Sequence, residues 1–170
     1  IFGSCSVDRS VCLWDLRTEK IAPVLNAKDL HSKHINVLSW NQHRSTQIAT
    51  GSDDCSFKVW DLRHFDKKSP ISYFKWHRKP ITSLEWSPFD ETVLMTSSED
   101  DTIGIWDLSL ENDIERKIKG AQLNQEVPPQ LLFVHMGQQE IKESHFHPQI
   151  KNMVISTASK GYHLFIPENI

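Results

Sequence analysis

The chain has 170 residues, of which 38% are hydrophobic and 24% charged, with 19 basic residues against 22 acidic ones. This length is enough for one domain with a sizeable core, and the balanced composition excludes a disordered chain and a broad basic surface for nucleic acid. The longest apolar runs have about five residues, whereas a membrane-spanning helix needs about 20.

The cysteines and the first residue indicate the cellular compartment and the extent of the chain. Cys5, Cys12 and Cys55 form an odd set without CxxC spacing, which favours reduced thiols inside the cell over a disulfide framework. The chain opens with Ile1, directly on a strand-like apolar run. We therefore expect further sequence before Ile1.

One interval of 46 residues recurs along the chain. It separates the three tryptophans Trp14, Trp60 and Trp106, and four further columns keep the same interval. Those columns are Asp8/Asp54/Asp100, Ser4/Thr50/Thr96, His31/His77 and Trp40/Trp86. Five columns in one register indicate a true structural repeat.

Short apolar segments rich in β-formers alternate with polar turns throughout these repeats. In chain order we expect strands at 1–6, 11–14, 35–40, 47–50, 57–60, 69–76, 81–86, 93–96, 103–106, 130–135, 141–146, 154–157 and 162–165. Four short strands in each unit of about 40–45 residues are typical of a β-propeller blade.

The repeat divides the chain into four units. They are a partial blade at 1–17, a blade at 31–76, a blade at 77–135 with a loop insertion at 109–128, and a degenerate last blade at 136–170. In the last unit Phe146 takes the place of Trp86, and Phe165 stands where the repeated tryptophan would be. The sequence therefore predicts an all-β fold, the C-terminal half of a propeller, with about three and a half blades here and about seven when complete.

The dipeptides Trp14-Asp15, Trp60-Asp61 and Trp106-Asp107 resemble the Trp-Asp signature of the WD-repeat family. In that family a buried chain of hydrogen bonds connects the indole N–H to a Ser or Thr hydroxyl, then to a histidine, then to a turn aspartate. The resemblance implies three such sets: Trp60, Thr50, His31 and Asp54; Trp106, Thr96, His77 and Asp100; and Trp14, Ser4 and Asp8, whose histidine would precede Ile1.

Several residues could serve a partner instead of the fold. Trp76 lies outside the repeated columns, so it is either an exposed anchor or a core ring beside Phe74. The turn acids Asp53, Glu99 and Asp101 either meet a basic client at one rim of the ring or stabilise their own turns. Arg17 and Arg63 complete two Trp-Asp-x-Arg matches, a pattern with which some WD proteins dock on the adaptor of a cullin-type ubiquitin ligase, although ordinary strand ends also produce it.

The sequence contains no GxSxG, glycine-rich phosphate loop or HExxH motif, so we expect no enzymatic activity and no cofactor. His145, His147 and His163 in the last unit are the best metal-ligand candidates, and His145 and His147 could pair because alternate strand residues share a face. Acidic or cysteine ligands at metal-site spacing do not accompany them, which favours a structural role.

Longer segments, 36–40, 58–65, 129–135 and 142–149, resemble the glutamate-rich WD-repeat family across essentially the whole chain. That resemblance implies a nuclear and nucleolar protein of large-subunit ribosome assembly that keeps a basic ribosomal protein soluble and meets pre-ribosomal factors. Two alternatives stay open, a histone-binding subunit of chromatin assembly and a substrate receptor of a ubiquitin ligase. Neither direct, specific nucleic-acid binding nor membrane binding is expected.

Overall fold

The computed structural model describes residues 1–19, 22–67, 69–110 and 127–168. These residues contain fourteen strands and one short 3-10 helix. The elements are β1 (Phe2–Cys5), β2 (Val11–Trp14), β3 (Leu25–Ala27), β4 (Ile35–Trp40), β5 (Gln47–Ser52), β6 (Phe57–Asp61), η1 (Leu62–Lys67), β7 (Ser72–Phe74), β8 (Ile81–Trp86), β9 (Val93–Ser98), β10 (Ile103–Asp107), β11 (Leu131–His135), β12 (Glu143–Phe146), β13 (Val154–Ala158) and β14 (Gly161–Phe165).

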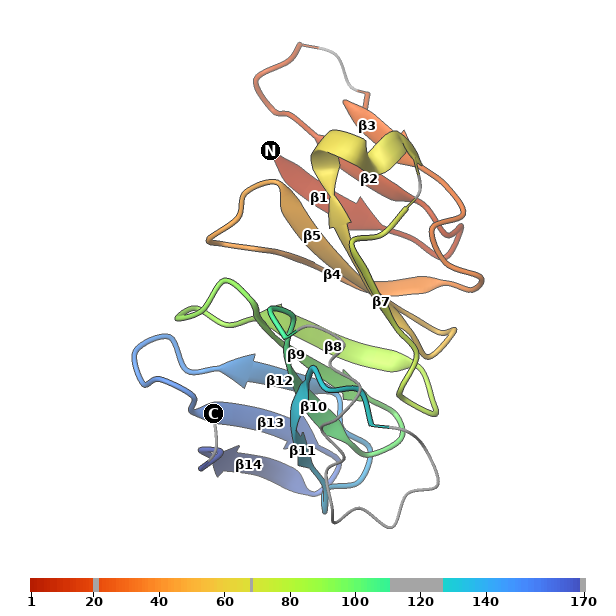
Figure 1. Ribbon diagram of the computed structural model, residues 1–170. Coiled ribbons are helices and arrows are strands. Elements are labelled where there is room, and N and C mark those ends of the chain that lie inside the picture. Colours follow the sequence, from red (N-terminus) through yellow and green to blue (C-terminus); the bar gives the residue numbers. More distant parts are fainter. Residues whose placement is uncertain (20–21, 68, 111–126, 169–170) are drawn as a thin grey trace.

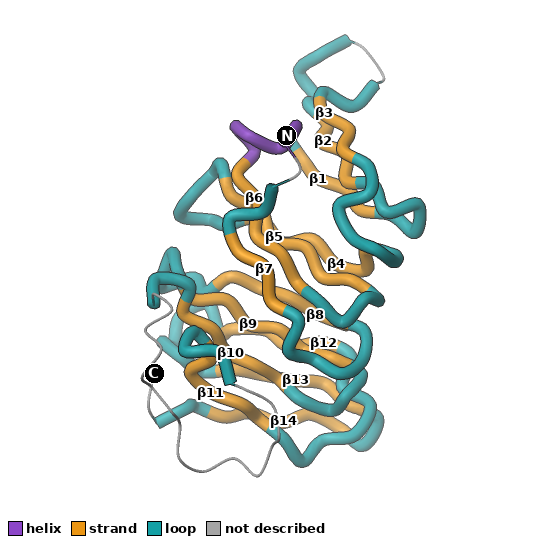
Figure 2. Tube along the Cα trace, turned by 45° about the vertical axis from the view of Figure 1, so that its right-hand side comes forward, coloured by secondary structure: helices purple, strands orange, loops and turns teal. Residues whose placement is uncertain are grey.

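The strands form four antiparallel sheets, which we number in chain order. The first sheet is β1-β2-β3, the second β4-β5-β6-β7, the third β8-β9-β10-β11 and the fourth β12-β13-β14. Figure 1 shows them stacked one after another, from the red first sheet to the blue fourth sheet. The tube in Figure 2 shows the strands of neighbouring sheets running across the stack in layers. This arrangement confirms the all-β fold and is that of part of a β-propeller.

The second and third sheets repeat one another in register. Ile48 pairs with Trp60 in the second sheet, and Leu94 pairs with Trp106 in the third. Each sheet also carries a register irregularity near the start of its first strand, at Ile35/Val37 and at Ile81/Ser83. The 46-residue interval of the sequence is therefore an interval between equivalent backbone positions.

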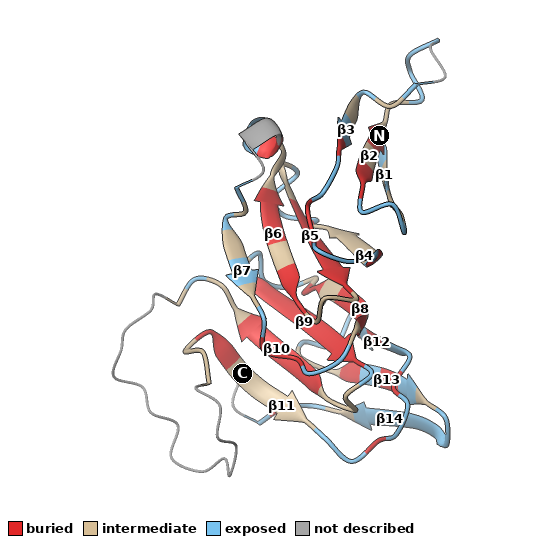
Figure 3. Cartoon of the chain, turned by 90° about the vertical axis from the view of Figure 1, so that its right-hand side faces the viewer, coloured by how far each residue is buried: buried red, intermediate tan, exposed pale blue. Residues whose placement is uncertain are grey.

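Apolar side chains fill the spaces between neighbouring sheets. One core cluster joins the first and second sheets, a second joins the second and third, and a third joins the third and fourth. Strands β5, β6, β8, β9 and β10 are accordingly the most buried in Figure 3. Gly51 allows this close approach, because a Cβ there would lie 2.6 Å from Cγ2 of Ile81 and 2.7 Å from Cγ1 of Val37.

Two features go beyond the strands expected from the sequence. β3 adds a third strand to the first sheet by pairing with β2; its three residues, Leu-Asn-Ala, give no alternating β-branched signal. η1 follows β6 and buries Phe65. The insertion expected at 109–128 falls mainly on residues 111–126, which lie outside the described residues. Among the described residues, no helix combines the length and apolar character needed to cross a bilayer.

Candidate protein-interaction surfaces and the network beneath them

A chain of hydrogen bonds runs through the second sheet. The Trp60 indole donates to Oγ1 of Thr50 at 2.9 Å, and that hydroxyl lies 2.8 Å from Nε2 of His31. Nδ1 of the same ring lies 3.2 Å from Oδ2 of Asp54. Because the Asp54 carboxylate can only accept, Nδ1 carries the proton that His31 donates to it, and in the neutral ring Nε2 accepts from the Thr50 hydroxyl.

Asp54 is the most heavily bonded member of this chain. Besides His31, its carboxylate accepts from the backbone N–H of Ser32 at 3.0 Å and of Ser56 at 3.1 Å, and from the Ser56 hydroxyl. Burial alone raises the pKa of Asp54, but the bonds from His31 and Ser56 outweigh it and hold the pKa well below 3.8. The carboxylate thus stays ionised and orients the loop between β3 and β4, which carries His31.

The third sheet repeats the same arrangement. The Trp106 indole donates to Thr96 at 2.8 Å, Thr96 lies 2.8 Å from Nε2 of His77, and Nδ1 of His77 lies 3.2 Å from Asp100. Burial raises the pKa of Asp100, yet the bond from His77 is the largest of the opposing effects, and together these keep the pKa well below 3.8. The four side chains implied by the family resemblance lie together in both sheets.

The first sheet contains the corresponding shorter set. The Trp14 indole donates to the Ser4 hydroxyl at 2.9 Å, and the ring stacks on Phe2 with centroids 6.1 Å apart. Asp8 accepts from the N–H and the hydroxyl of Ser10 at 3.0 and 2.6 Å, and these bonds lower the pKa of its carboxyl.

One repeated column escaped the sequence analysis. Ser10, Ser56 and Thr102 are also 46 residues apart, and each donates a hydroxyl bond to the turn aspartate two residues earlier. The signal was present in the spacing. Hydroxyl residues are common in turns, however, and only the shared bond to aspartate distinguishes this column.

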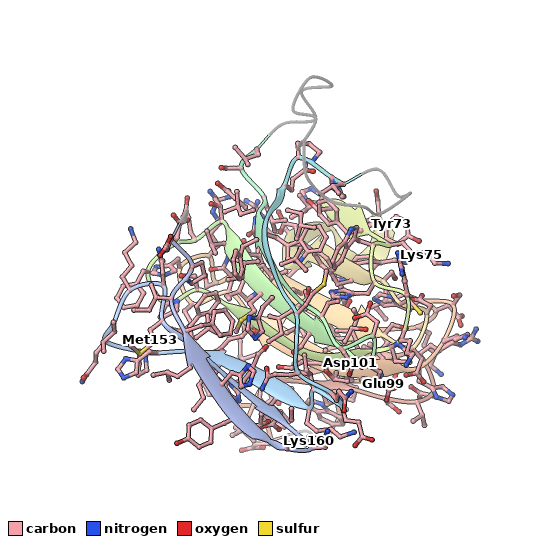
Figure 4. All side chains as sticks on the ribbon, turned by 90° about the horizontal axis from the view of Figure 1, so that it is seen from below. Tyr73, Lys75, Glu99, Asp101, Met153 and Lys160 are labelled. Carbon is pink, nitrogen blue, oxygen red and sulfur yellow. The ribbon has the colours of Figure 1, made fainter. Side chains whose placement is uncertain are left out.

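The acidic turn residues occupy one rim. Asp53 accepts from Nδ2 of Asn36 at 2.6 Å and lies 3.2 Å from Nδ1 of His34. Asp101, in the left-handed region at φ 64°, accepts from the Glu140 backbone N–H at 2.6 Å. Glu99 is exposed, and Figure 4 shows it close to Asp101 at the same side of the molecule. Two of the three carboxylates therefore also fix local structure.

Trp76 lies in the core between the second and third sheets. Its ring is 8% exposed and packs edge-on against Trp106, with centroids 5.8 Å apart. Phe74 packs against the same core cluster. The interpretation of Trp76 as an exposed anchor for a partner is thereby corrected, because the tryptophan contacts are made within the chain.

Arg17 and Arg63 lie at equivalent turns, and each binds the aspartate two residues earlier through two guanidinium nitrogens, an arrangement that we call a fork. Arg17 binds Asp15 through Nε at 2.9 Å and Nη2 at 2.6 Å, and Arg63 binds Asp61 in the same way. The bond from Arg63 is the main cause that lowers the pKa of Asp61 to about 2. Both arginine side chains stay open to solvent, at 80% and 68% exposure, so they present fixed guanidinium groups at one rim.

The three histidines considered as metal ligands are dispersed. His145 lies 3.2 Å from Glu85 and 3.6 Å from Glu143, and His163 lies 3.3 Å from His135. β12 ends at Phe146, so His147 does not continue the alternation, and its Nδ1 accepts from backbone N–H groups instead. In the part of the chain that the structure describes, no three His, Cys, Asp or Glu side chains are grouped for a metal ion.

Comparison with known proteins places the repeats. The family model "WD domain, G-beta repeat" matches residues 26–61 and 68–107. The chain is similar to Protein HEAT STRESS TOLERANT DWD 1 of Arabidopsis thaliana, with 49% identity over 70 residues, 37% of this chain and 15% of that protein.

Two further relatives cover a comparable part. The chain is 52% identical over 59 residues to Ribosome assembly protein rrb1 of Schizosaccharomyces pombe, 34% of this chain and 12% of that protein. It is 45% identical over 65 residues to Glutamate-rich WD repeat-containing protein 1 of Dictyostelium discoideum, 36% of this chain and 13% of that protein. The matched regions thus span less than a sixth of each of these relatives. The chain carries WD40 repeats, folded as antiparallel sheets of a β-propeller.

Proposed function

We propose that the protein is a non-catalytic, protein-binding scaffold of ribosome biogenesis that acts in the nucleus and nucleolus. Its client is a basic ribosomal protein of the large subunit, which it keeps soluble until assembly, and its other partners are pre-ribosomal factors. The observation that carries this proposal is the 52% identity to a ribosome assembly protein over 59 residues of the repeat region.

The surface chemistry supports such a client. The rim that carries Asp53, Glu99 and Asp101 offers carboxylates held on a rigid frame, and electrostatic complementarity of this kind steers a basic partner and excludes wrong ones. The Asp54 and Asp100 networks beneath that rim keep its turns in place. A scaffold of this design binds through preformed surfaces and needs no catalytic group.

The test is affinity purification of the complete, tagged protein from nuclear extract after nuclease treatment. We expect recovery of one basic large-subunit ribosomal protein together with assembly factors, since protein contacts survive removal of RNA. Recovery of histones with chromatin-assembly subunits, and no ribosomal protein, would contradict the proposal and support histone binding.

A second candidate function rests on the Arg17 and Arg63 forks. Both guanidinium groups are exposed and held by Asp15 and Asp61, a geometry suited to docking on the adaptor of a cullin-type ubiquitin ligase. The third sheet carries Ser109 at the equivalent position.

Combined Arg17→Ala and Arg63→Ala substitutions are expected to abolish adaptor binding in a pull-down if this candidate is right. The unfolding curve should stay nearly unchanged, because solvent-exposed ion pairs contribute little to stability. Adaptor recovery equal to that of the wild type would remove this candidate.

A further inference from the structure

A pocket lies between the second and third sheets, at the end where β6 and β10 finish. Its volume is about 150 Å³, and Val59 and Ser72 from the second sheet face Trp86 and Leu108 from the third. Val59 and Trp86 are each 2% exposed, so the apolar floor is deep. Polar side chains, among them Gln47 and Ser109, complete the lining, so the pocket is open and only partly apolar, and its volume is about that of one aromatic ring.

Glu91 lines this pocket and two further carboxylates bond its neighbour Thr92; we call this side of the pocket its mouth. The Thr92 hydroxyl, which lines it, lies 2.9 Å from Oδ1 of Asp90 and 2.9 Å from Oδ1 of Asp107. Glu91 also lines it and forms an ion pair with Arg44. Three carboxylates therefore stand against one guanidinium among these groups, and the mouth favours a cationic neighbour.

The same junction one repeat earlier shows which kind of side chain fits. There Phe65 of η1 is 2% exposed and packs edge-on against Trp60, with centroids 5.5 Å apart. Its core cluster includes Leu25, Trp40 and Leu62. An aromatic ring of the chain itself thus closes the space between the first and second sheets.

The walls of the two junctions correspond residue by residue. Trp86 and Leu108 follow Trp40 and Leu62 by 46 residues. Ser72 pairs with Val59 as Leu25 pairs with Leu13, which places Ser72 and Leu25 at equivalent points. The residue 46 positions after Phe65 is Glu111, which lies outside the described residues, so Phe65 has no aromatic counterpart at this interval in the sequence.

We propose that the pocket between β6–β7 and β8–β10 receives an aromatic or large aliphatic side chain of a partner segment, with lysine or arginine residues on either side of it facing Asp90, Glu91 and Asp107. The basic character of that partner rests on the proposed function. The apolar pocket selects the anchor residue, and the carboxylates select its basic surroundings. Together they define a short linear motif, a hydrophobic residue within a basic stretch.

Two fluorescent peptides test this proposal against the complete protein. One is rich in lysine and arginine with a single central phenylalanine, and the other carries alanine at that position. Burying one phenyl ring strengthens binding by about tenfold or more, so anisotropy should show at least that difference in Kd. Equal affinity of the two peptides would overturn the pocket assignment.

Three variants test whether the difference between the peptides arises at this pocket. Ser72→Phe places a ring in the pocket and should remove the preference for the phenylalanine peptide, whereas Ser69→Phe, on an exposed residue before β7, should keep it. Asp90→Asn removes one carboxylate of the mouth without changing side-chain volume and should weaken both peptides several-fold, more at low salt. It keeps the test decisive if Ser72→Phe does not fold. Unchanged binding by Asp90→Asn, or a retained preference in a folded Ser72→Phe, would count against the pocket.

One further outcome identifies a different occupant. If the phenylalanine preference appears only after deletion of residues 111–126, the chain's own insertion fills the pocket and the partner proposal is wrong. The proposal and the function it rests on fail separately. If the peptides differ in affinity but the purification recovers no ribosomal protein, the pocket proposal stands and the proposed client is wrong. If a ribosomal protein is recovered but the two peptides bind equally, only the pocket proposal is wrong.

Discussion

Replacing Trp106 by alanine is expected to lower the free energy of unfolding of the complete protein by about 4 kcal/mol, the usual cost of removing a fully buried large aromatic side chain. Trp106 is 0% exposed and its ring centroid lies 4.9 Å from that of Phe57, 5.2 Å from that of Phe74 and 5.8 Å from that of Trp76. The substitution leaves a cavity where the second and third sheets meet. Denaturant unfolding followed by tryptophan fluorescence measures the loss.

A graded pair of controls separates the contributions of the Trp106 ring. Trp106→Phe keeps an aromatic ring but removes the indole N–H that donates to Thr96, so we expect a loss of about 2 kcal/mol. Leu16→Ala truncates a side chain that is 81% exposed and should change stability by less than about 0.5 kcal/mol. If Trp106→Ala proved as stable as Leu16→Ala, the ring would not be part of the core of the complete propeller.

Asp54→Ala is expected to lower the free energy of unfolding by about 3 kcal/mol. It removes several bonds at once and takes the carboxylate acceptor from Nδ1 of His31 and from the backbone N–H groups of Ser32 and Ser56. The neighbouring Asp53→Ala is the matched control. Its side chain is 31% exposed and its bonds are to the surface residues Asn36 and His34, so a loss of less than about 1 kcal/mol is expected. Comparable losses for the two variants would show that the buried network has no special role.

The Asp54 network also predicts a pH dependence. The folded-state pKa of Asp54 lies below its unfolded value of 3.8, so the folded protein takes up this proton at lower pH than the unfolded chain does. Its stabilisation is fully present above about pH 4 and is lost as the pH falls towards the folded-state pKa. The difference in unfolding free energy between wild type and Asp54→Ala should therefore shrink below pH 4. A constant difference across that range would contradict the ionised network.

The sequence predicts the repeat and its strands because one buried network recurs at one interval. Trp60, Thr50, His31 and Asp54 must meet, and their spacing along the chain reports that requirement. The ends of the strands are predicted less well from the sequence. The expected strand at 69–76 is shorter in the structure, β7 at Ser72–Phe74; Pro70 before it has no backbone N–H to donate to the ladder.

Contacts between neighbouring repeats could not be predicted from the spacing of residues along the chain alone. Trp76 illustrates this, since strand alternation indicates packing beside Phe74 but gives no sign that Trp106 from the next sheet covers the ring. The pocket beside Trp86 likewise depends on what stands opposite Leu108 in space. The Arg17 and Arg63 forks depend on side-chain conformations that a four-residue pattern does not specify.

The buried networks, the arginine side chains and the pocket are the features that support the proposed binding scaffold. The buried networks under Asp54 and Asp100 fix the turns of one rim, and the arginine forks and the pocket mark the other end of the strands. Rigid elements of this kind lose little entropy when a partner binds. In the proposal made above, the carboxylates beside the pocket would add specificity for a basic client.

The most direct measurement is the solubility of newly made large-subunit ribosomal proteins in cells from which the complete protein is depleted. After a short metabolic label, the nuclear fraction is separated by centrifugation and the labelled ribosomal proteins are identified in the supernatant and the pellet. We predict that one basic large-subunit protein moves to the pellet while the others stay soluble, and that re-expression restores it. An unchanged distribution of every labelled ribosomal protein would contradict the chaperone role.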